Sequence, residues 1–142
     1  MFEISSTSIE EYKNKSFVTP ECGGVVTFEG RVRNHNEGQS VESLEYEVYD
    51  VLALKEGEKI LKETKGKFDI LDAFCVHRVG HLQIGDLAVW IAVTSKHRRD
   101  AFRACEFIID EVKKTVPIWK KEHYADKSID SKWVFCEEDH RH

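Results

Sequence analysis

The fold is decided by the stretch LAVWIAVTSKHRRDAFRACEFIIDEVKKTVP, residues 87–117. Its first seven residues are all apolar, which is typical of a central strand covered on both faces. Ser95 is the predicted N-cap of a helix in which apolar side chains recur with a 3.6-residue period. The apolar positions are Ala101, Phe102, Cys105, Ile108, Ile109 and Val112. Because Pro117 cannot continue this helix, we expect Lys113 and Lys114 in its last turns.

Two further helices and several strands are predicted on the N-terminal side of this stretch. Thr7 and Glu10 form a possible capping box for a helix ending near Lys15. Alternating or apolar runs predict strands at residues 1–6, 25–33, 44–49 and 68–79, and a longer helix at 50–65. Gly38, in a loop over residues 34–38, is free to adopt a positive φ.

The rest of the chain is predicted to form connecting and terminal segments. Residues 80–86 are expected to connect two strands, residues 120–132 to form a polar segment, and residues 133–136 a short apolar run. Residues 123–142 are expected to form a flexible tail whose last six residues are frayed. Strands and helices together predict an α+β domain.

Length and composition limit the class of protein. A chain of 142 residues predicts one domain, spanning residues 1–142. The longest apolar run has seven residues and the N-terminus lacks a signal core, so neither export nor membrane spanning is expected. We therefore expect a cytoplasmic protein with its four cysteines reduced. A formal net charge of −5 argues against a general nucleic-acid coat.

Three basic clusters nevertheless stand out at the predicted ends of strands and helices. They are Arg31, Arg33 and His35; His97, Arg98 and Arg99; and Lys113, Lys114, Lys120 and Lys121. Basic side chains at a helix N-terminus oppose the helix dipole unless an anion binds there. The clusters therefore indicate either one shared anionic pocket or three solvated surface patches.

The individual side chains leave further alternatives open. A lysine partly desolvated among other cations can act in acid–base or nucleophilic chemistry, whereas Lys113 can equally be a favourable charge at a helix end. His77 and His81 have a spacing that could suit a metal, but they lack a third ligand at a convincing distance in the sequence. No phosphate-binding glycine loop or nucleophile elbow is present.

Four motifs carry a resemblance to a known family. They read VVTFEGRVRNHN at 25–36, HRVG at 77–80, VTSKHR at 93–98 and VPIWKKE at 116–122. In this order they resemble the large, catalytic subunit of molybdopterin synthase. The resemblance implies an α/β-hammerhead-like domain with a mixed or antiparallel sheet and a long helix in the C-terminal half.

The resemblance also implies an activity and an assembly. Such an enzyme is a sulfur transferase of molybdenum cofactor biosynthesis, which converts cyclic pyranopterin monophosphate into molybdopterin. Two sulfurs are installed as a dithiolene, and each comes from the thiocarboxylated C-terminus of a small ubiquitin-like subunit. Two large subunits form a homodimer within a heterotetramer. No cofactor and no metal are implied for the chain itself.

Site residues follow from the same resemblance. Lys113 and Lys120 match the two lysines associated with catalysis. The residues expected to contact substrate are Phe28, Arg31, Val32, Arg33, His97, Arg98, Lys113, Lys120, Lys121 and Glu122. Part of the pocket is expected to come from the neighbouring protomer. Two other hypotheses are a non-catalytic homo-oligomer that binds an anion or nucleotide, and a single-stranded RNA binder, which the net charge disfavours.

Overall fold

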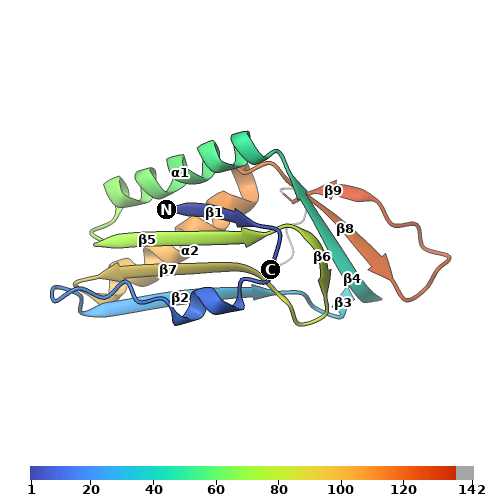
Figure 1. Cartoon of the computed structure of the whole chain (residues 1–142), viewed down its shortest axis with the longest axis horizontal. Coiled ribbons are helices and arrows are strands. Elements are labelled where there is room, and N and C mark those ends of the chain that lie inside the picture. The colour runs from blue at the N-terminus through green and yellow to red at the C-terminus, as the bar shows by residue number, and fades with distance from the viewer. Residues whose placement is uncertain (137–142) are drawn as a thin grey trace.

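The first of two sheets forms the body of the molecule. The computed structural model describes residues 1–136, and Figure 1 shows their arrangement. In this sheet the strand order is β1-β5-β7-β2, with β1 parallel to β5 and the other pairs antiparallel. The bounds are β1 (Phe2–Ser5), β2 (Gly24–Arg31), β5 (Asp72–Arg78) and β7 (Leu87–Ser95).

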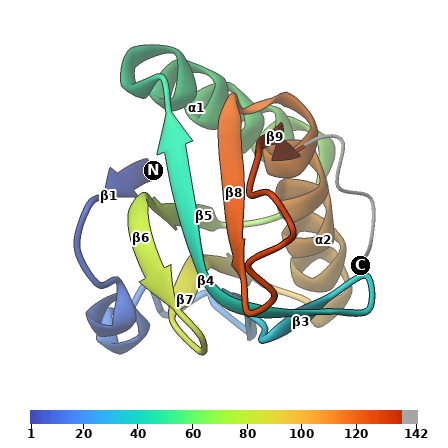
Figure 2. The same cartoon turned by 90° about the vertical axis from the view of Figure 1, so that its right-hand side faces the viewer.

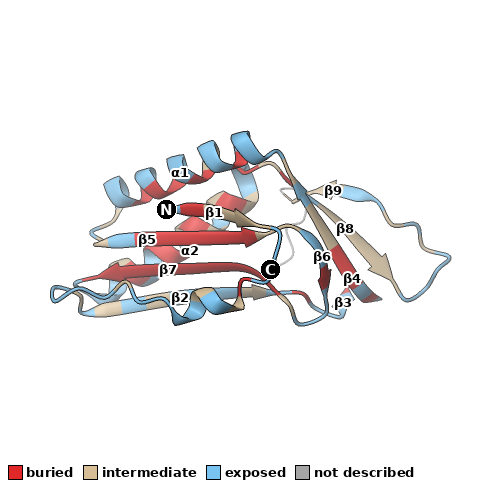
Figure 3. Ribbon diagram, viewed as in Figure 1, coloured by how far each residue is buried: buried red, intermediate tan, exposed pale blue. Residues whose placement is uncertain are grey.

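Strand β7 is the centre of this sheet, as its apolar sequence predicts. All nine of its residues are buried, as Figure 3 shows. Helices α1 (Asp50–Lys67) and α2 (Arg98–Thr115) cover one face. The core between them includes Ala53, Ile60 and Leu61 of α1, Ala101, Ile108 and Val112 of α2, and Val89, Ile91 and Val93 of β7. Burying these apolar side chains is what fixes the two helices on the sheet.

The N-terminal segment covers the opposite face of the same sheet. Ile9 is fully buried beside the 3₁₀ helix η1 (Glu10–Asn14). The ring of Phe17 stacks on Phe74 at 5.3 Å between centroids, and Phe74 packs against Trp90. Because its odd- and even-numbered side chains both meet apolar partners, β7 has no polar face.

A second sheet stands at one end of the first. Its order is β3-β4-β8-β9, with β6 paired to the other side of β4. Figure 2 looks onto β4, β6 and β8 of this sheet. The bounds are β3 (His35–Asn36), β4 (Gln39–Val48), β6 (Gly80–Gln83), β8 (Ile118–Tyr124) and β9 (Trp133–Phe135). Two helices with mixed and antiparallel strands confirm the α+β prediction.

Two predicted helix starts are wrong. Helix α2 begins at Arg98 with His97 as its N-cap, and the Ser95 hydroxyl donates to the His97 carbonyl instead of capping the helix. The capping box at Thr7 does not form either, because η1 starts after Ile9 and has no side-chain cap. In both places the preceding strand or loop runs further than the sequence signal suggests.

Two segments predicted as connections are strands. β6 lies inside the expected connection over residues 80–86, and β8 includes the start of the expected polar segment. Within the expected tail over residues 123–142, the described part contains the end of β8 and all of β9. The predicted fraying of residues 137–142 falls outside the described residues. The turn at Gly38 has the positive φ expected of it, 79°.

Two other sequence expectations can be compared with the structure. The four cysteines are free. Among the described residues, no helix combines the length and apolar character needed to cross a membrane.

The glycines of α1 provide a matched test of this packing. Alanine normally stabilises a helix relative to glycine by about 1 kcal/mol, and Gly66→Ala should do so because a Cβ there meets nothing within 4 Å. At Gly57 a Cβ would lie 2.2 Å from the Phe2 ring, so Gly57→Ala should destabilise the protein by about 1–3 kcal/mol. Urea unfolding of both variants measures this difference, and a stabilised Gly57→Ala would contradict the packing of β1 on α1.

Candidate functional site

The two sheets and the end of α2 enclose a cavity of about 310 Å³. Its cationic side chains are Arg31 and Arg33, from the end of β2 and the loop after it, Lys113 from the last turns of α2, and Lys120 from β8. The remaining walls are Val32, His35, Asn36, Val41, Leu44, Tyr46 and Glu122. Four cations around one carboxylate and one histidine suit a small anionic compound.

The two lysines are brought together by a sharp reversal of the chain. Helix α2 ends at Thr115, because Val116 is extended and Pro117 follows it. Strand β8 begins at Ile118, and the buried side chains of Val116 and Ile118 anchor the reversal in the core. Lys113 and Lys120 therefore approach the cavity from a helix and from a strand.

Burial and neighbouring charges both act on the pKa of Lys120. Burial lowers its pKa from the ordinary value for lysine, and the positive charges of Lys113 and Arg33 lower it further. The carboxylate of Glu122 opposes this shift. A lysine with a lowered pKa gives up and regains its proton more readily near neutral pH than an exposed lysine does.

Glu122 is held in place by a side chain that sequence reasoning did not select. The Asn36 amide donates to both carboxylate oxygens of Glu122, at 2.8 and 3.0 Å. Asn36 is buried and comes from β3, next to the turn at Gly38. The amide thus fixes the carboxylate on the cavity wall near Lys120.

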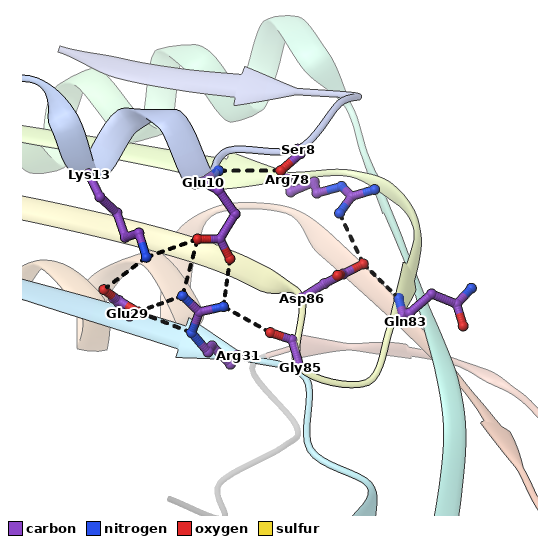
Figure 4. A network of polar contacts seen from close by, with 9 residues as sticks. All are labelled: Ser8, Glu10, Lys13, Glu29, Arg31, Arg78, Gln83, Gly85 and Asp86. Atoms are coloured by element: carbon purple, nitrogen blue, oxygen red, sulfur yellow. Dashed lines mark hydrogen bonds and ion pairs between the residues drawn. The ribbon is translucent and has the colours of Figure 1, made fainter.

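Arg31 lines the cavity, but its guanidinium group is already engaged. As Figure 4 shows, it donates to Glu10 at 2.6 Å, to Glu29 at 2.8 Å and to the Gly85 carbonyl at 2.9 Å. Hydrogen bonds from Arg31 hold the pKa of Glu10 at about 2. Arg31 ties η1 to the edge of β2. Val32 is buried and its N–H donates to the Asp86 carbonyl, so it contributes an apolar wall.

His97 and Arg98 do not reach this cavity within one chain. They line a separate cavity of about 520 Å³ with Gly23, Lys96, Arg99 and Phe102, at the start of α2. Arg33 and Lys113 lie at the other end of β2 and α2, as the course of these elements in Figure 1 indicates. One chain therefore brings together two of the three basic clusters and separates the third.

Two other expected site residues take different positions. Phe28 does not line the main cavity but lies in the wall of a smaller cavity, which Lys113 also lines. Lys121 points to the outer side of β8, where its ammonium lies 5.7 Å from the centre of the Trp133 ring. Strand alternation explains this, because Lys120 and Lys121 are adjacent and face opposite sides.

His77 and His81, whose spacing in the sequence could suit a metal, are also separated. His77 is buried in β5, whereas His81 stacks on His123 at 5.6 Å between ring centroids on the outer face of the second sheet. No group of three or more metal-ligating side chains occurs in residues 1–136.

Tyr46 and Asn36 are cavity residues that the sequence did not reveal. Tyr46 is opposite Lys120 in the β4–β8 register, and Leu44 is opposite Glu122. Alternation along 44–48 correctly puts Leu44 and Tyr46 on one face. The pairing of this strand with β8 could not be predicted, because the sequence predicts a polar segment from residue 120 onward. Asn36 belongs to a stretch rich in loop-forming residues, where nothing distinguishes it from its neighbours.

The fold and cavity define an α+β protein with a cationic cavity between two sheets. Comparisons with known proteins identify its family. The family model described as "MoaE protein" matches residues 3–115. A molybdopterin synthase catalytic subunit from Pyrococcus abyssi is 51% identical over 100 residues, covering 70% of this chain and 68% of that protein. One from Staphylococcus aureus is 44% identical over 133 residues, covering 93% and 88%.

Solved structures agree with the sequence relatives. The crystal structure of molybdopterin synthase from Staphylococcus aureus has a TM-score of 0.85 and 43% identity, covering 94% of this chain and 96% of that one. A complex of subunits 1 and 2 of molybdopterin-converting factor from Helicobacter pylori has a TM-score of 0.70 at 21% identity, covering 89% and 90%, and shows the shared fold. The chain belongs to the MoaE family.

The balance between Glu122 and Lys120 gives a pH-dependent prediction. Glu122→Gln removes the negative charge that opposes the shift, so the pKa of Lys120 should fall further below its ordinary value. Asn36 can still donate a hydrogen bond to the side-chain carbonyl of the glutamine, so the shape of the cavity wall at this position is preserved. NMR titration of the lysine side chains measures the change.

Glu47→Gln is the matched control for this titration. Glu47 lies on the same strand pair but on the opposite face, where it is paired with Trp119. Lys120 should titrate as in the unchanged protein. Identical titration of Lys120 in both variants would show that Glu122 does not act on it.

Proposed function

We propose that this MoaE-family enzyme of molybdenum cofactor biosynthesis transfers sulfur to cyclic pyranopterin monophosphate and so forms molybdopterin. The sulfur donor is the thiocarboxylated C-terminus of a small ubiquitin-like subunit. The observation that carries the proposal is the convergence of Arg33, Lys113 and Lys120 on one cavity of about 310 Å³. Its size and charge suit a small phosphorylated compound of fused rings.

The phosphate of the substrate is the group that the cations recognise. A guanidinium group such as that of Arg33 can donate two parallel hydrogen bonds to a phosphate, whereas a lysine ammonium acts as a point charge. Arg31 already donates to Glu10 and Glu29, so its contribution to phosphate binding requires those ion pairs to rearrange. Arg33 is thus the arginine of this chain best suited to the phosphate.

The lysines supply charge stabilisation and proton transfer. The thiocarboxylate sulfur attacks a side-chain carbon of the pterin, a carbon–sulfur bond forms, and the carbon–oxygen bond to the phosphate breaks. Lys113 stabilises the negative charge that develops on the leaving oxygen. Lys120, whose pKa is lowered by burial, orients the thiocarboxylate and exchanges the proton. Water then hydrolyses the acyl group from the new thiol and releases the partner's C-terminus as a carboxylate.

A second copy of the chain completes the site in this proposal. Strand β2 is an edge strand that pairs only with β7 among the described strands, and Val25 and Phe28 on it are exposed. Unpaired edges favour pairing with another chain. Antiparallel pairing of two β2 edges about Thr27 and Phe28 sets Gly24 of one copy opposite Arg31 of the other.

This pairing brings the third basic cluster to the cavity. A Cβ on Gly24 would lie 3.4 Å from the Cα of Arg98. His97 and Arg98 therefore lie next to the start of β2, and they move with it when β2 pairs with a second copy. In the paired arrangement they lie near Arg31 of the second copy, at the mouth of its cavity. A two-fold dimer repeats this geometry at a second site. The separation of the clusters within one chain is therefore consistent with a site shared between two copies.

The small subunit is supported by the Helicobacter pylori neighbour, whose title describes a complex of subunits 1 and 2 of molybdopterin-converting factor. A flexible C-terminal peptide needs an open route to Lys113 and Lys120, and the main cavity lies at the surface between β3, β4 and β8. The carboxylate of the released peptide is an anion, so the same cations also suit the product.

Replacement of the lysines tests the proposed chemistry. Lys113→Ala and Lys120→Ala should each lower product formation by about 100-fold or more, because each removes a charge from the reacting groups. Lys114→Ala is the matched control, since Lys114 is exposed and outside the cavity, and it should retain full activity. Mass spectrometry of the pterin, after mixing with excess thiocarboxylated partner, measures dithiolene formation.

Two results would contradict the proposal. Unimpaired dithiolene formation by both lysine variants would remove the lysines from the mechanism. Binding of the pterin phosphate by the unchanged protein without any thiolated product would favour the non-catalytic, anion-binding module instead.

A further inference from the structure

A smaller cavity of about 100 Å³, here called the inner cavity, adjoins the main one. The two cavities share Arg31, Tyr46 and Lys113 as walls. Most of the remaining lining is apolar, from Phe28, Gly30, Ala88, Val89, Ile109, Val112 and Ile118, but it also includes His77 and Cys136. Its size allows a few water molecules, and its polar groups can bind them. Lys113 is thus a wall that the inner cavity and the main cavity share.

His77 is fixed in one tautomer by its backbone contact. The ring lies 2.8 Å from the Arg78 carbonyl through Nδ1, and a carbonyl only accepts, so Nδ1 carries the hydrogen. Burial lowers the pKa of His77 to about 4, and the positive charge of Lys113 contributes to this shift. At neutral pH the ring is uncharged, and Nε2 presents a lone pair. Within residues 1–136 this nitrogen makes no hydrogen bond, and His77 borders the inner cavity.

The orientation of the His77 ring is also fixed by packing. Its edge meets the Tyr46 ring at 83°, with 4.9 Å between centroids. The ring is held between β5 and β4, and His77 is only 6% exposed. A histidine needed only to fill the core could be replaced by an apolar residue, whereas this one keeps an acceptor inside a cavity that Lys113 also lines.

The other ionisable groups around the inner cavity are Arg31 from β2, Lys113 from α2, Tyr46 from β4 and Cys136 after β9. Arg31 and Lys113 are donors only. Burial raises the pKa values of Tyr46 and Cys136, so both stay protonated at neutral pH. The lone pair of His77 is therefore the strongest neutral acceptor among these groups, and Lys113 is the charged donor that shares the cavity with it.

We propose that His77 is a positioning residue whose Nε2 accepts a hydrogen bond from a water molecule in the inner cavity, which in turn accepts one from the Lys113 ammonium. This contact holds the ammonium at the junction of the two cavities, where it faces the leaving oxygen. The catalytic consequence rests on the proposed function, but the contact between His77 and Lys113 does not.

Two substitutions separate the two ring nitrogens. In His77→Asn the amide nitrogen can take the place of Nδ1 and donate to the Arg78 carbonyl, but the acceptor towards Lys113 is lost. In His77→Gln the longer side chain can place its oxygen near the position of Nε2, while the backbone anchor is weakened. A structural role predicts that asparagine is the better substitute, and a positioning role predicts that glutamine is.

The first readout is independent of catalysis. Acylation of Lys113 by an activated acetate ester, followed by peptide mass spectrometry, reports how firmly the amine is held, since a hydrogen-bonded ammonium reacts slowly. In His77→Asn the rate at Lys113 should rise by about threefold or more, with His77→Gln closer to the unchanged protein. Lys114 in the same peptide region is exposed and serves as the internal control, with an unchanged rate. Equal Lys113 rates in all three proteins would overturn the proposed contact.

The second readout is sulfur transfer. His77→Asn should lower kcat by about tenfold or more with little change in KM. Displacement of a catalytic group slows the chemical step and has little effect on substrate binding. His77→Gln should be the more active of the two variants, even where its melting temperature is lower. The reverse order of activity would show that His77 serves only the fold. Altered acylation of Lys113 without any effect on kcat would retain the contact and remove its catalytic role.

Discussion

The site depends on one constraint, the reversal of the chain at Val116 and Pro117. Val116 donates to the Val112 carbonyl as the last residue tied to α2, and Pro117 has no N–H with which to continue the helix. The side chains of Val116 and Ile118 are buried, so the reversal cannot shift without disturbing the core. Lys113 and Lys120 are consequently held at fixed positions on two rigid elements, which is a better support for chemistry than a loop would be.

The charged side chains around this reversal divide into ion pairs outside the cavity and an excess of cations inside it. Glu10 and Glu29 pair with Arg31 on the outside of β2, and Arg78 pairs with Asp86. Inside the cavity Glu122 is the only carboxylate among the described lining residues, and it is tied to Asn36. Cations remain in excess where an anion is to bind, although the whole chain carries a formal charge of −5. Net charge therefore excludes a general polyanion-binding surface and leaves a local anion site open.

The sequence predicted most of the first sheet and little of the second. Strand β7 and helix α2 have long, consistent apolar patterns, and both were predicted correctly apart from the start of α2. Strand β8 was missed because Lys120, Lys121 and Glu122 are three successive charged residues, and only pairing with β4 makes them a strand. The lysines were selected by family resemblance. The side chains of Asn36 and His77 contact residues that are distant in the sequence, Glu122 and Tyr46, and no local pattern predicts such contacts.

The sharing of one site between two copies is tested most directly by sulfur transfer in a mixed dimer of His97→Ala and Lys120→Ala chains. Co-expression with two different affinity tags isolates dimers that contain one chain of each kind. Each variant alone should be inactive. The mixed dimer has one site with both residues intact, so it should recover about half of the activity of the unchanged dimer. A mixed dimer as inactive as its parents would show that His97 and Lys120 do not meet across the two copies.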